Sequence, residues 1–466
     1  MAIRRGFLVT ILLVLATNAL AGTGRIIIVN RDSAGEGFND PTPVTPVGGN
    51  EGTTIGQQRL NVFERAGARW SSVLEINVDI RVRASFASLT CDETGVILGQ
   101  AGAITTHMNF PNAPLQNILY PAALANQLAG RDLAPTEDDI SAQFNSALDN
   151  PTCRGADGWY YGFDGDEETD DALYTVVLHE LGHGLGFIGG GVDQNTPTVF
   201  DTNIFDVTAG LRWSEMNAPQ REISAINTGK LVWAGRNVTE RAPRYLDLAT
   251  TLTITEPEAV ARNYDYGTAV FGPPANRALI SGQIIAATDD ANPSATDGCT
   301  AYNNASAVAG RIALVDRGNC PFVLKAANAQ AAGAIGLLIV NNVSTCVPLD
   351  MAGIDPTIRI PVVSITQDDG AALRAQLPST TVSASLRVDP SQRAGATSAG
   401  QVRLYAPCTF RRGSSIYHFD TTASPNLVME PAINADLLDT LDLTVYLMMD
   451  LGWTQPPRTG RRTLRR

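Results

Sequence analysis

The chain has 466 residues, of which 44% are apolar and 17% are charged, and its formal net charge is −13. This composition excludes an intrinsically disordered chain, and the length allows about three domains. The acidic balance argues against a nucleic-acid-binding protein, because such proteins need a basic face.

The N-terminus has the pattern of an export signal. Arg4 and Arg5 precede the apolar run 6–15, and a small-x-small cleavage site follows at 19–21. The run is too short to span a bilayer, so we assign residues 1–21 to a signal peptide. We expect a protein that is secreted, extracellular or periplasmic, without a stable membrane span, in which the six cysteines form disulfides.

Strand and helix patterns alternate in the first part of the mature chain. Residues 24–30 predict a buried strand, residues 57–74 an amphipathic helix and residues 76–82 a half-buried strand. This order indicates an α+β or α/β arrangement.

A mostly apolar helix is predicted over residues 172–188. Asp170 and Asp171 stand where carboxylates cap a helix N-terminus and interact favourably with its dipole. Three glycines lie between 182 and 186, and we expect the helix to end near 184–186.

Strands and a helix are predicted again in the middle of the chain, and a last helix near its end. Strand-like runs at 312–315, 335–340 and 360–365 flank an Ala-rich helix at 325–332, which indicates a small separate α/β domain. Residues 436–451 predict an amphipathic helix.

The helix at 172–188 contains the sequence HELGH, which is an HExxH motif. Spacing of four residues places His179 and His183 on one helix face, where both can bind a single Zn²⁺. Glu180 lies beside them and can take a proton from a metal-bound water. Because the chain has only four histidines, their concentration in one motif is informative.

A catalytic zinc needs a third protein ligand, which the helix does not supply. Gly189 stands where the compact pattern HExxHxxGxxH places its last histidine. The remaining histidines are His107 and His418. Acidic alternatives follow the helix, and these are Asp201, Asp206 and Glu215.

Two segments resemble the leishmanolysin-like metzincins. HELGHGLGF at 179–187 resembles the first active-site segment of that group, and residues 417–453 resemble the C-terminal one. The resemblance implies that His418 is the distant third ligand and that Met429, in the sequence Val-Met-Glu-Pro, forms the Met-turn beneath the metal. It also matches the Asp-Leu-Gly-Trp sequence at 450–453 to the end of a helix.

The middle of the chain resembles the protease-associated domain. The similarity is carried by residues 310–342 and 360–373, with the sequences Asp-Arg-Gly at 316–318 and Cys-Pro-Phe at 320–322. Such domains carry no catalytic residues and are thought to bind substrates or partners. We therefore expect an insert that is dispensable for metal binding, with Cys299–Cys320 as the best candidate for an internal disulfide.

The resulting fold class is α+β, a metzincin-like zinc-protease domain split by an inserted α/β protease-associated domain. Its expected parts are the signal peptide at 1–21, the catalytic domain at 22–267 and 391–456, the insert at 268–390 and a basic tail at 457–466.

The expected function is that of a secreted zinc-dependent endopeptidase acting on proteins or peptides, with one catalytic Zn²⁺ and Glu180 as general base. Two alternatives stay open: a catalytically silent binding or adhesion protein on the same scaffold, and a zinc hydrolase with an acidic third ligand. The acidic run 164–171 could hold a structural Ca²⁺, but it departs from the EF-hand pattern, and a solvated acidic loop is the preferred interpretation.

Overall fold

The computed structural model describes residues 24–92, 95–149, 153, 158–274, 279–291, 293–434, 437 and 439–456. The expected signal peptide and the expected basic tail lie outside the described residues. Within the described ranges, no helix is both long enough and apolar enough to cross a membrane.

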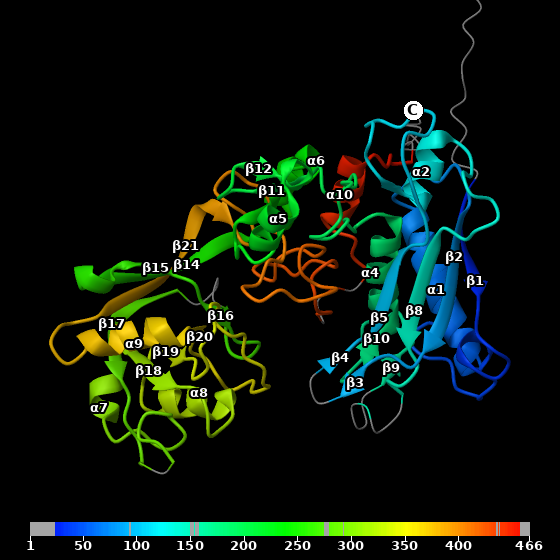
Figure 1. Ribbon diagram of the computed structural model, residues 1–466. Coiled ribbons are helices and arrows are strands. Elements are labelled where there is room, and N and C mark those ends of the chain that lie inside the picture. Colours follow the sequence, from blue (N-terminus) through cyan, green and yellow to red (C-terminus); the bar gives the residue numbers. More distant parts are fainter. Residues whose placement is uncertain are drawn as a thin grey trace, which may run out of the picture.

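The chain forms two lobes (Figure 1). The main lobe contains residues 24–247 and 394–456, which share one hydrophobic core. The inserted lobe contains residues 248–393, and its two hydrophobic clusters use only side chains between Leu252 and Leu386. Each lobe therefore buries its own apolar side chains.

The main lobe begins with a four-stranded sheet in the order β1-β2-β8-β5. Its members are β1 (Ile26–Asn30), β2 (Ile80–Ala87), β8 (Ile140–Asn145) and the antiparallel edge strand β5 (Gly99–Ala103). The strand expected at 76–82 begins later and extends further, because pairing with β1 starts at Ile80 and continues beyond Val82.

Two long helices pack together against this sheet (Figure 1). They are α1 (Ile55–Ser71) and α4 (Leu173–Leu185). The Trp70 indole on α1 donates a hydrogen bond of 3.1 Å to the carbonyl oxygen of Leu178 on α4. This bond fixes the helix that carries the HExxH motif against its neighbour.

The expected carboxylate cap of α4 is wrong. The helix begins after Ala172, which makes no side-chain capping bond. Asp171 belongs to β10 (Asp171–Ala172), which pairs with β9 (Trp159–Tyr160), and the Asp170 carboxylate accepts a hydrogen bond from the Gly158 amide instead. The strand pairing of Asp171 and the bond between Asp170 and Gly158 therefore replace the expected capping role.

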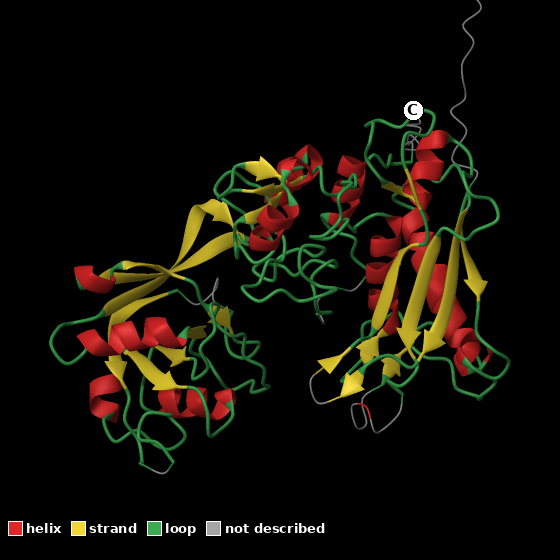
Figure 2. Ribbon diagram, viewed as in Figure 1, coloured by secondary structure: helices red, strands yellow, loops and turns green. Residues whose placement is uncertain are grey.

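Shorter elements and long loops complete the main lobe (Figure 2). Its helices and strands are α2 (Ala122–Ala129), α5 (Ala218–Ser224), α6 (Arg236–Tyr245), α10 (Thr444–Leu451), β11 (Ile204–Asp206), β12 (Leu211–Arg212) and β13 (Leu231–Trp233). Two-stranded pairs are formed by β3 (Cys91–Asp92) with β4 (Gly95–Val96) and by β6 (Thr106–His107) with β7 (Tyr120–Pro121).

The last helix is shorter than expected. It begins at Thr444 rather than 436, because the Asp442 carboxylate accepts hydrogen bonds from the Thr444 amide and hydroxyl. Asp439 and Asp442 have positive φ angles, which a right-handed helix does not allow.

The inserted lobe contains an eight-stranded sheet in the order β15-β14-β21-β17-β18-β19-β20-β16. The strands are β14 (Leu248–Glu256), β15 (Arg262–Tyr264), β16 (Gly267–Thr268), β17 (Ile280–Ala286), β18 (Ile312–Asp316), β19 (Gly336–Val340), β20 (Val362–Ile365) and β21 (Ser383–Arg393). Its helices are α7 (Ala305–Val308), α8 (Phe322–Ala331) and α9 (Gln367–Gln376).

The insert leaves and rejoins the main lobe at one place. Leu248 on β14 pairs with Arg393 on β21, so the entering and leaving strands lie side by side. The sheet already begins at Leu248, whereas the insert was expected to begin at 268. Closely spaced ends allow a folded unit to interrupt another one without disrupting it.

Candidate metal centre

The active-site candidate is built on α4, whose residues are all buried. His179 and His183 lie one turn apart on one face of the helix. The helix ends at Gly186, whose φ of +135° is a backbone conformation that other residues rarely adopt. The glycines thus end the helix in the region expected from the sequence, directly after the second histidine.

Three histidine side chains converge on one point. The Nε2 atom of His183 lies 3.1 Å from that of His179 and 3.3 Å from that of His418, and the third separation is 3.2 Å. Among the residues that the structure describes, this is the one group of three or more His, Cys, Asp or Glu side chains arranged to hold a metal ion. The fold brings together ligands that are 235 residues apart in the chain.

Each imidazole is held by a backbone carbonyl at its other nitrogen. His179 Nδ1 lies 2.6 Å from the Val428 oxygen, His183 Nδ1 lies 2.7 Å from the Phe187 oxygen and His418 Nδ1 lies 2.7 Å from the Ser414 oxygen. A carbonyl can only accept, so the proton stays on Nδ1 and the Nε2 lone pairs face one another. Such carbonyl partners fix the tautomer and orientation of metal-binding histidines.

Burial keeps these rings neutral. It lowers the pKa of His179 to about 3, with a contribution from the neighbouring His183, and it lowers the pKa of His183 to about 4. Burial and the other two rings also lower the pKa of His418 well below its usual value. Neutral imidazole is the form that binds a metal.

The donor set fits zinc. Tetrahedral coordination with Zn–N distances of about 2.0–2.1 Å separates two nitrogen ligands by about 3.3 Å. The three Nε2 separations lie between 3.1 and 3.3 Å. Three neutral nitrogen ligands leave one position of a tetrahedron open for water or substrate.

Glu180 lies beside the histidines, at the edge strand β5. An ideal Cβ atom on Gly99 would lie 3.0 Å from Glu180 Cγ, so the glycine makes room for this side chain. Burial raises the pKa of Glu180 to about 8, against a hydrogen bond from the Ala101 backbone that lowers it. A strongly raised pKa marks this carboxyl group as a candidate for proton transfer.

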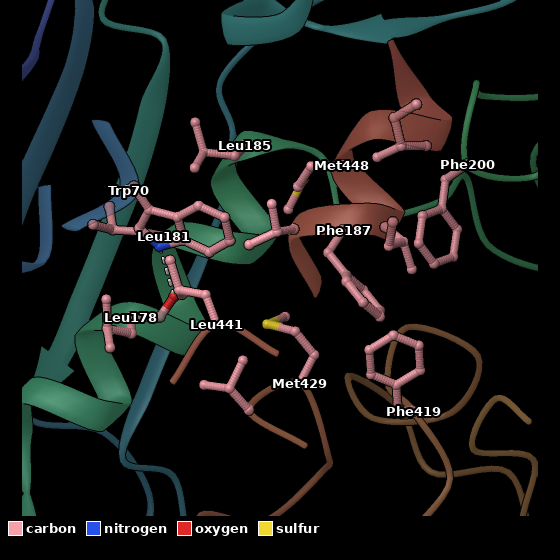
Figure 3. Close-up of a cluster of buried hydrophobic side chains, with 14 of the residues drawn as sticks. Trp70, Leu178, Leu181, Leu185, Phe187, Phe200, Phe419, Met429, Leu441 and Met448 are labelled. Carbon is pink, nitrogen blue, oxygen red and sulfur yellow. Dashed lines mark hydrogen bonds between the residues drawn. The ribbon is translucent and has the colours of Figure 1, made fainter. Parts of the chain in front are cut away.

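Met429 lies next to α4, in the C-terminal active-site segment, because an ideal Cβ atom on Gly182 would lie 2.7 Å from its Sδ atom. Its side chain packs among Phe187, Phe419 and Leu181 (Figure 3). The Met429 carbonyl accepts a hydrogen bond of 2.8 Å from the Phe419 amide, directly after His418. The adjoining Val428 supplies the carbonyl that orients His179.

Two acidic residues that the sequence did not single out hold this turn. The Leu427 amide donates to a Glu430 carboxylate oxygen over 2.8 Å, and the Val428 amide donates to Asp442 over 2.7 Å. Asp442 stands between two leucines in the sequence, and an acidic residue within an apolar run is a signal that could have identified it.

The Asp-Leu-Gly-Trp sequence at 450–453 connects α10 with α4 and α6 through hydrogen bonds. The Trp453 indole donates a hydrogen bond of 3.1 Å to the Leu185 carbonyl, at the last turn of α4. The Asp450 carboxylate accepts from the Trp233 indole and from the Asn237 and Val238 amides, at the first turn of α6. The Asp-Leu-Gly-Trp sequence therefore fixes α10 between the two other helices.

The alternative ligands lie outside the histidine cluster. Asp201 is buried, and one of its oxygens accepts from the Thr198 amide and hydroxyl. An ideal Cβ atom on Gly189 would lie 2.5 Å from its other oxygen and 2.9 Å from the Tyr417 ring. A histidine at 189 would therefore need the space that these two side chains occupy.

The other candidates serve the local backbone or lie elsewhere. Asp206 accepts hydrogen bonds from Thr208, Ala209, Ser224 and Asn227, and Glu215 accepts from the Arg212 amide in a short turn. His107 lies on β6, which pairs with β7. The acidic run 164–171 contributes no further metal-binding group among the described residues, and Asp164 accepts a hydrogen bond from the Tyr160 hydroxyl.

All six cysteines are paired. Cys299–Cys320 joins two segments of the inserted lobe, as expected, and Cys91–Cys153 lies in the main lobe. Cys346–Cys408 connects the inserted lobe with the main lobe.

Comparisons with known proteins match two separate segments. A family model described as PA domain matches residues 280–373, and one described as SPBPB7E8-like matches residues 49–205, which include the HExxH motif.

Curated relatives match over short stretches. The chain is 36% identical over 126 residues to the probable lipoprotein aminopeptidase LpqL of Mycobacterium tuberculosis, which is 27% of this chain and 23% of that protein. It is 45% identical over 102 residues to signal peptide peptidase-like 2 of Arabidopsis thaliana, which is 21% of this chain and 18% of that protein. The chain thus spans less than a quarter of the length of these relatives.

Among solved structures, an aminopeptidase from Aneurinibacillus sp. strain AM-1 aligns with 22% identity and a TM-score of 0.23, covering 33% of this chain and 37% of that one. This score is too low to relate the two whole folds. Taken together, the strand order and the family match show that the chain has a mixed α/β fold interrupted by a PA domain at residues 280–373.

Proposed function

We propose that the protein is an exported zinc-dependent endopeptidase of metzincin type, related in its active-site segments to the leishmanolysin-like group. The observation that carries the proposal is the convergence of His179, His183 and His418 beside Glu180. In this assignment the three imidazoles bind zinc and Met429 supports them from below.

The bound zinc would supply a water of lowered pKa and would polarise the scissile carbonyl. Glu180 would accept the proton of that water and later donate it to the leaving amine. Its buried position suits this role, because a carboxyl group whose pKa is raised toward neutrality is a more effective proton acceptor and donor.

The edge strand β5 supports an endopeptidase. Among the described strands, β5 pairs only with β8, so one side of its backbone is not used by the sheet. It lies directly beside Glu180. An extended peptide can add to such an edge through main-chain hydrogen bonds, and it can then extend past the zinc in both directions.

An aminopeptidase is the second candidate, because several relatives bear that name. However, another relative of comparable identity is named signal peptide peptidase-like, and each match covers less than a quarter of the relative. Segments shared by peptidases with different names favour a common accessory domain over a common active site. The binding or adhesion protein remains the outcome if zinc binds without turnover.

The test compares two substrate classes on the purified mature protein. We expect about one zinc per chain, cleavage of internally quenched peptides with blocked amino termini, and loss of cleavage with 1,10-phenanthroline. Cleavage restricted to aminoacyl p-nitroanilides would favour the aminopeptidase, and activity after complete metal removal would exclude a zinc enzyme of either kind.

A further inference from the structure

The third ligand, His418, lies at the end of a loop that is attached at two places. We call residues 405–418 the ligand loop. At its base, the Tyr405 amide donates to the His418 carbonyl over 2.9 Å, and the Ile416 amide donates to the Tyr405 carbonyl over 2.7 Å. At its outer part, Cys408 is joined to Cys346, which lies in the connection between β19 and β20 of the inserted lobe.

The orientation of His418 depends on the outer part of the loop. Its Nδ1 atom bonds to the carbonyl of Ser414, which belongs to a turn closed by bonds from the Ser414 and Ser415 amides to the Arg411 carbonyl. Residues 409–413 are exposed, whereas Ser415 is buried and its hydroxyl accepts a hydrogen bond of 2.9 Å from the Arg411 amide. The outer residues of the loop therefore have little packing of their own.

The backbone between the turn and the ligand is strained. Ile416 has a φ of +81°, which is unfavourable for a β-branched residue, and its side chain is fully buried. Such a conformation persists only where the surroundings impose it. The hydrogen bonds at the base of the loop constrain Ile416 directly. The Cys346–Cys408 disulfide is the covalent constraint on the rest of the loop.

We propose that the Cys346–Cys408 disulfide positions His418, so that the inserted lobe supports the third zinc ligand through this tether. The inference rests on the proposed metal site. It revises the expectation that the insert is dispensable for metal binding, because deleting the insert would remove Cys346 and release the ligand loop. The disulfide thus gives the PA-containing lobe a role at the metal, although none of the three proposed ligands belongs to that lobe.

The test compares two double variants of the full chain. Cys346→Ser with Cys408→Ser removes the tether without leaving a free thiol, and Cys299→Ser with Cys320→Ser removes a disulfide confined to the inserted lobe. The zinc Kd is measured by chelator competition, the melting temperature is recorded for both, and Co²⁺ is substituted to report on coordination geometry.

Loss of the tether is expected to weaken zinc binding about 10- to 100-fold, as for the loss of partners that orient metal-binding histidines. The Co²⁺ visible spectrum should change in this variant only. A melting temperature that falls in both variants would reflect general stabilisation, so it does not replace the metal readouts. Equal zinc Kd values and unchanged Co²⁺ spectra in the two variants would overturn the inference.

If the tether variant does not fold by circular dichroism, the wild-type holoprotein serves instead. Cys346 is exposed, so mild reduction by a phosphine should reach it. Zinc release that parallels reduction of Cys346–Cys408, mapped by mass spectrometry, supports the proposal, whereas zinc retained after its full reduction contradicts it. A wild-type chain that binds no zinc would overturn the proposed function together with this inference.

Discussion

The side chain of Met429 occupies the space that any side chain at position 182 would need. An ideal Cβ atom on Gly182 would lie 2.7 Å from Met429 Sδ and 3.2 Å from its methyl carbon. Gly182 lies inside the HExxH motif, between the two histidines of α4. The glycine therefore lets the turn at 427–430 approach the helix closely enough for Val428 to orient His179.

Gly182→Ala should destabilise the protein. Overpacking a core costs about 1–3 kcal/mol, whereas alanine gains up to about 1 kcal/mol over glycine in a helix. We expect a net loss on the order of 1–2 kcal/mol in the free energy of unfolding, measured by urea denaturation. Gly102→Ala is the control, because its Cβ would meet only Ile188, at 3.7 Å. Equal stability of the two variants would contradict the close packing of Met429.

Glu180→Gln should bind zinc as the wild type does but lose turnover. In our assignment the carboxylate is not a ligand, and general-base action contributes about 10²- to 10⁴-fold to the rate. Zinc content by atomic absorption and kcat on a quenched peptide measure the two effects separately. Glu240→Gln, at an exposed ion pair on α6, should change neither. Loss of zinc in Glu180→Gln would mean that Glu180 is a ligand or a structural group.

His418→Ala should sharply lower zinc affinity, because it leaves two protein ligands where a catalytic site needs three. His107→Ala is the matched control and should bind zinc like the wild type, since His107 lies outside the cluster. Asp201→Ala tests the acidic alternative. Zinc binding that survives His418→Ala and is lost in Asp201→Ala would return the third ligand to Asp201.

Asp450→Ala should destabilise the main lobe without removing a zinc ligand. The carboxylate accepts from the Trp233 indole and from two amides at the start of α6, and these donors would be left without it. We expect a loss of about 2–3 kcal/mol in the free energy of unfolding. Asp389→Ala is the control, because this residue of β21 is only partly buried and its carboxylate accepts hydrogen bonds from the Ser391 amide and hydroxyl; it should change the free energy of unfolding by less than about 0.5 kcal/mol. Similar stabilities would show that Asp450 contributes little.

Sequence patterns that span only a few residues were sufficient to predict the helices of the active-site region. Helical spacing predicted α1 and a mostly apolar run predicted α4. The glycines predicted the end of α4, and a spacing of four placed His179 and His183 on one face. These features depend on neighbours along the chain, because helix geometry alone determines which side chains share a face. The resemblance of two short segments was needed to select His418.

Contacts between distant parts of the chain decided the rest. The sequence did not indicate that carbonyls of Val428, Phe187 and Ser414 would orient the three imidazoles, because every residue has a carbonyl and only the fold aims it. Asp171 is a residue type that commonly caps helices, but pairing with Trp159 placed it in a strand. Likewise, six cysteines allow fifteen pairings, and only the juxtaposition of the two lobes joined Cys346 to Cys408. Such choices depend on which surfaces meet after folding, and this information is distributed over the whole chain rather than contained in any local pattern.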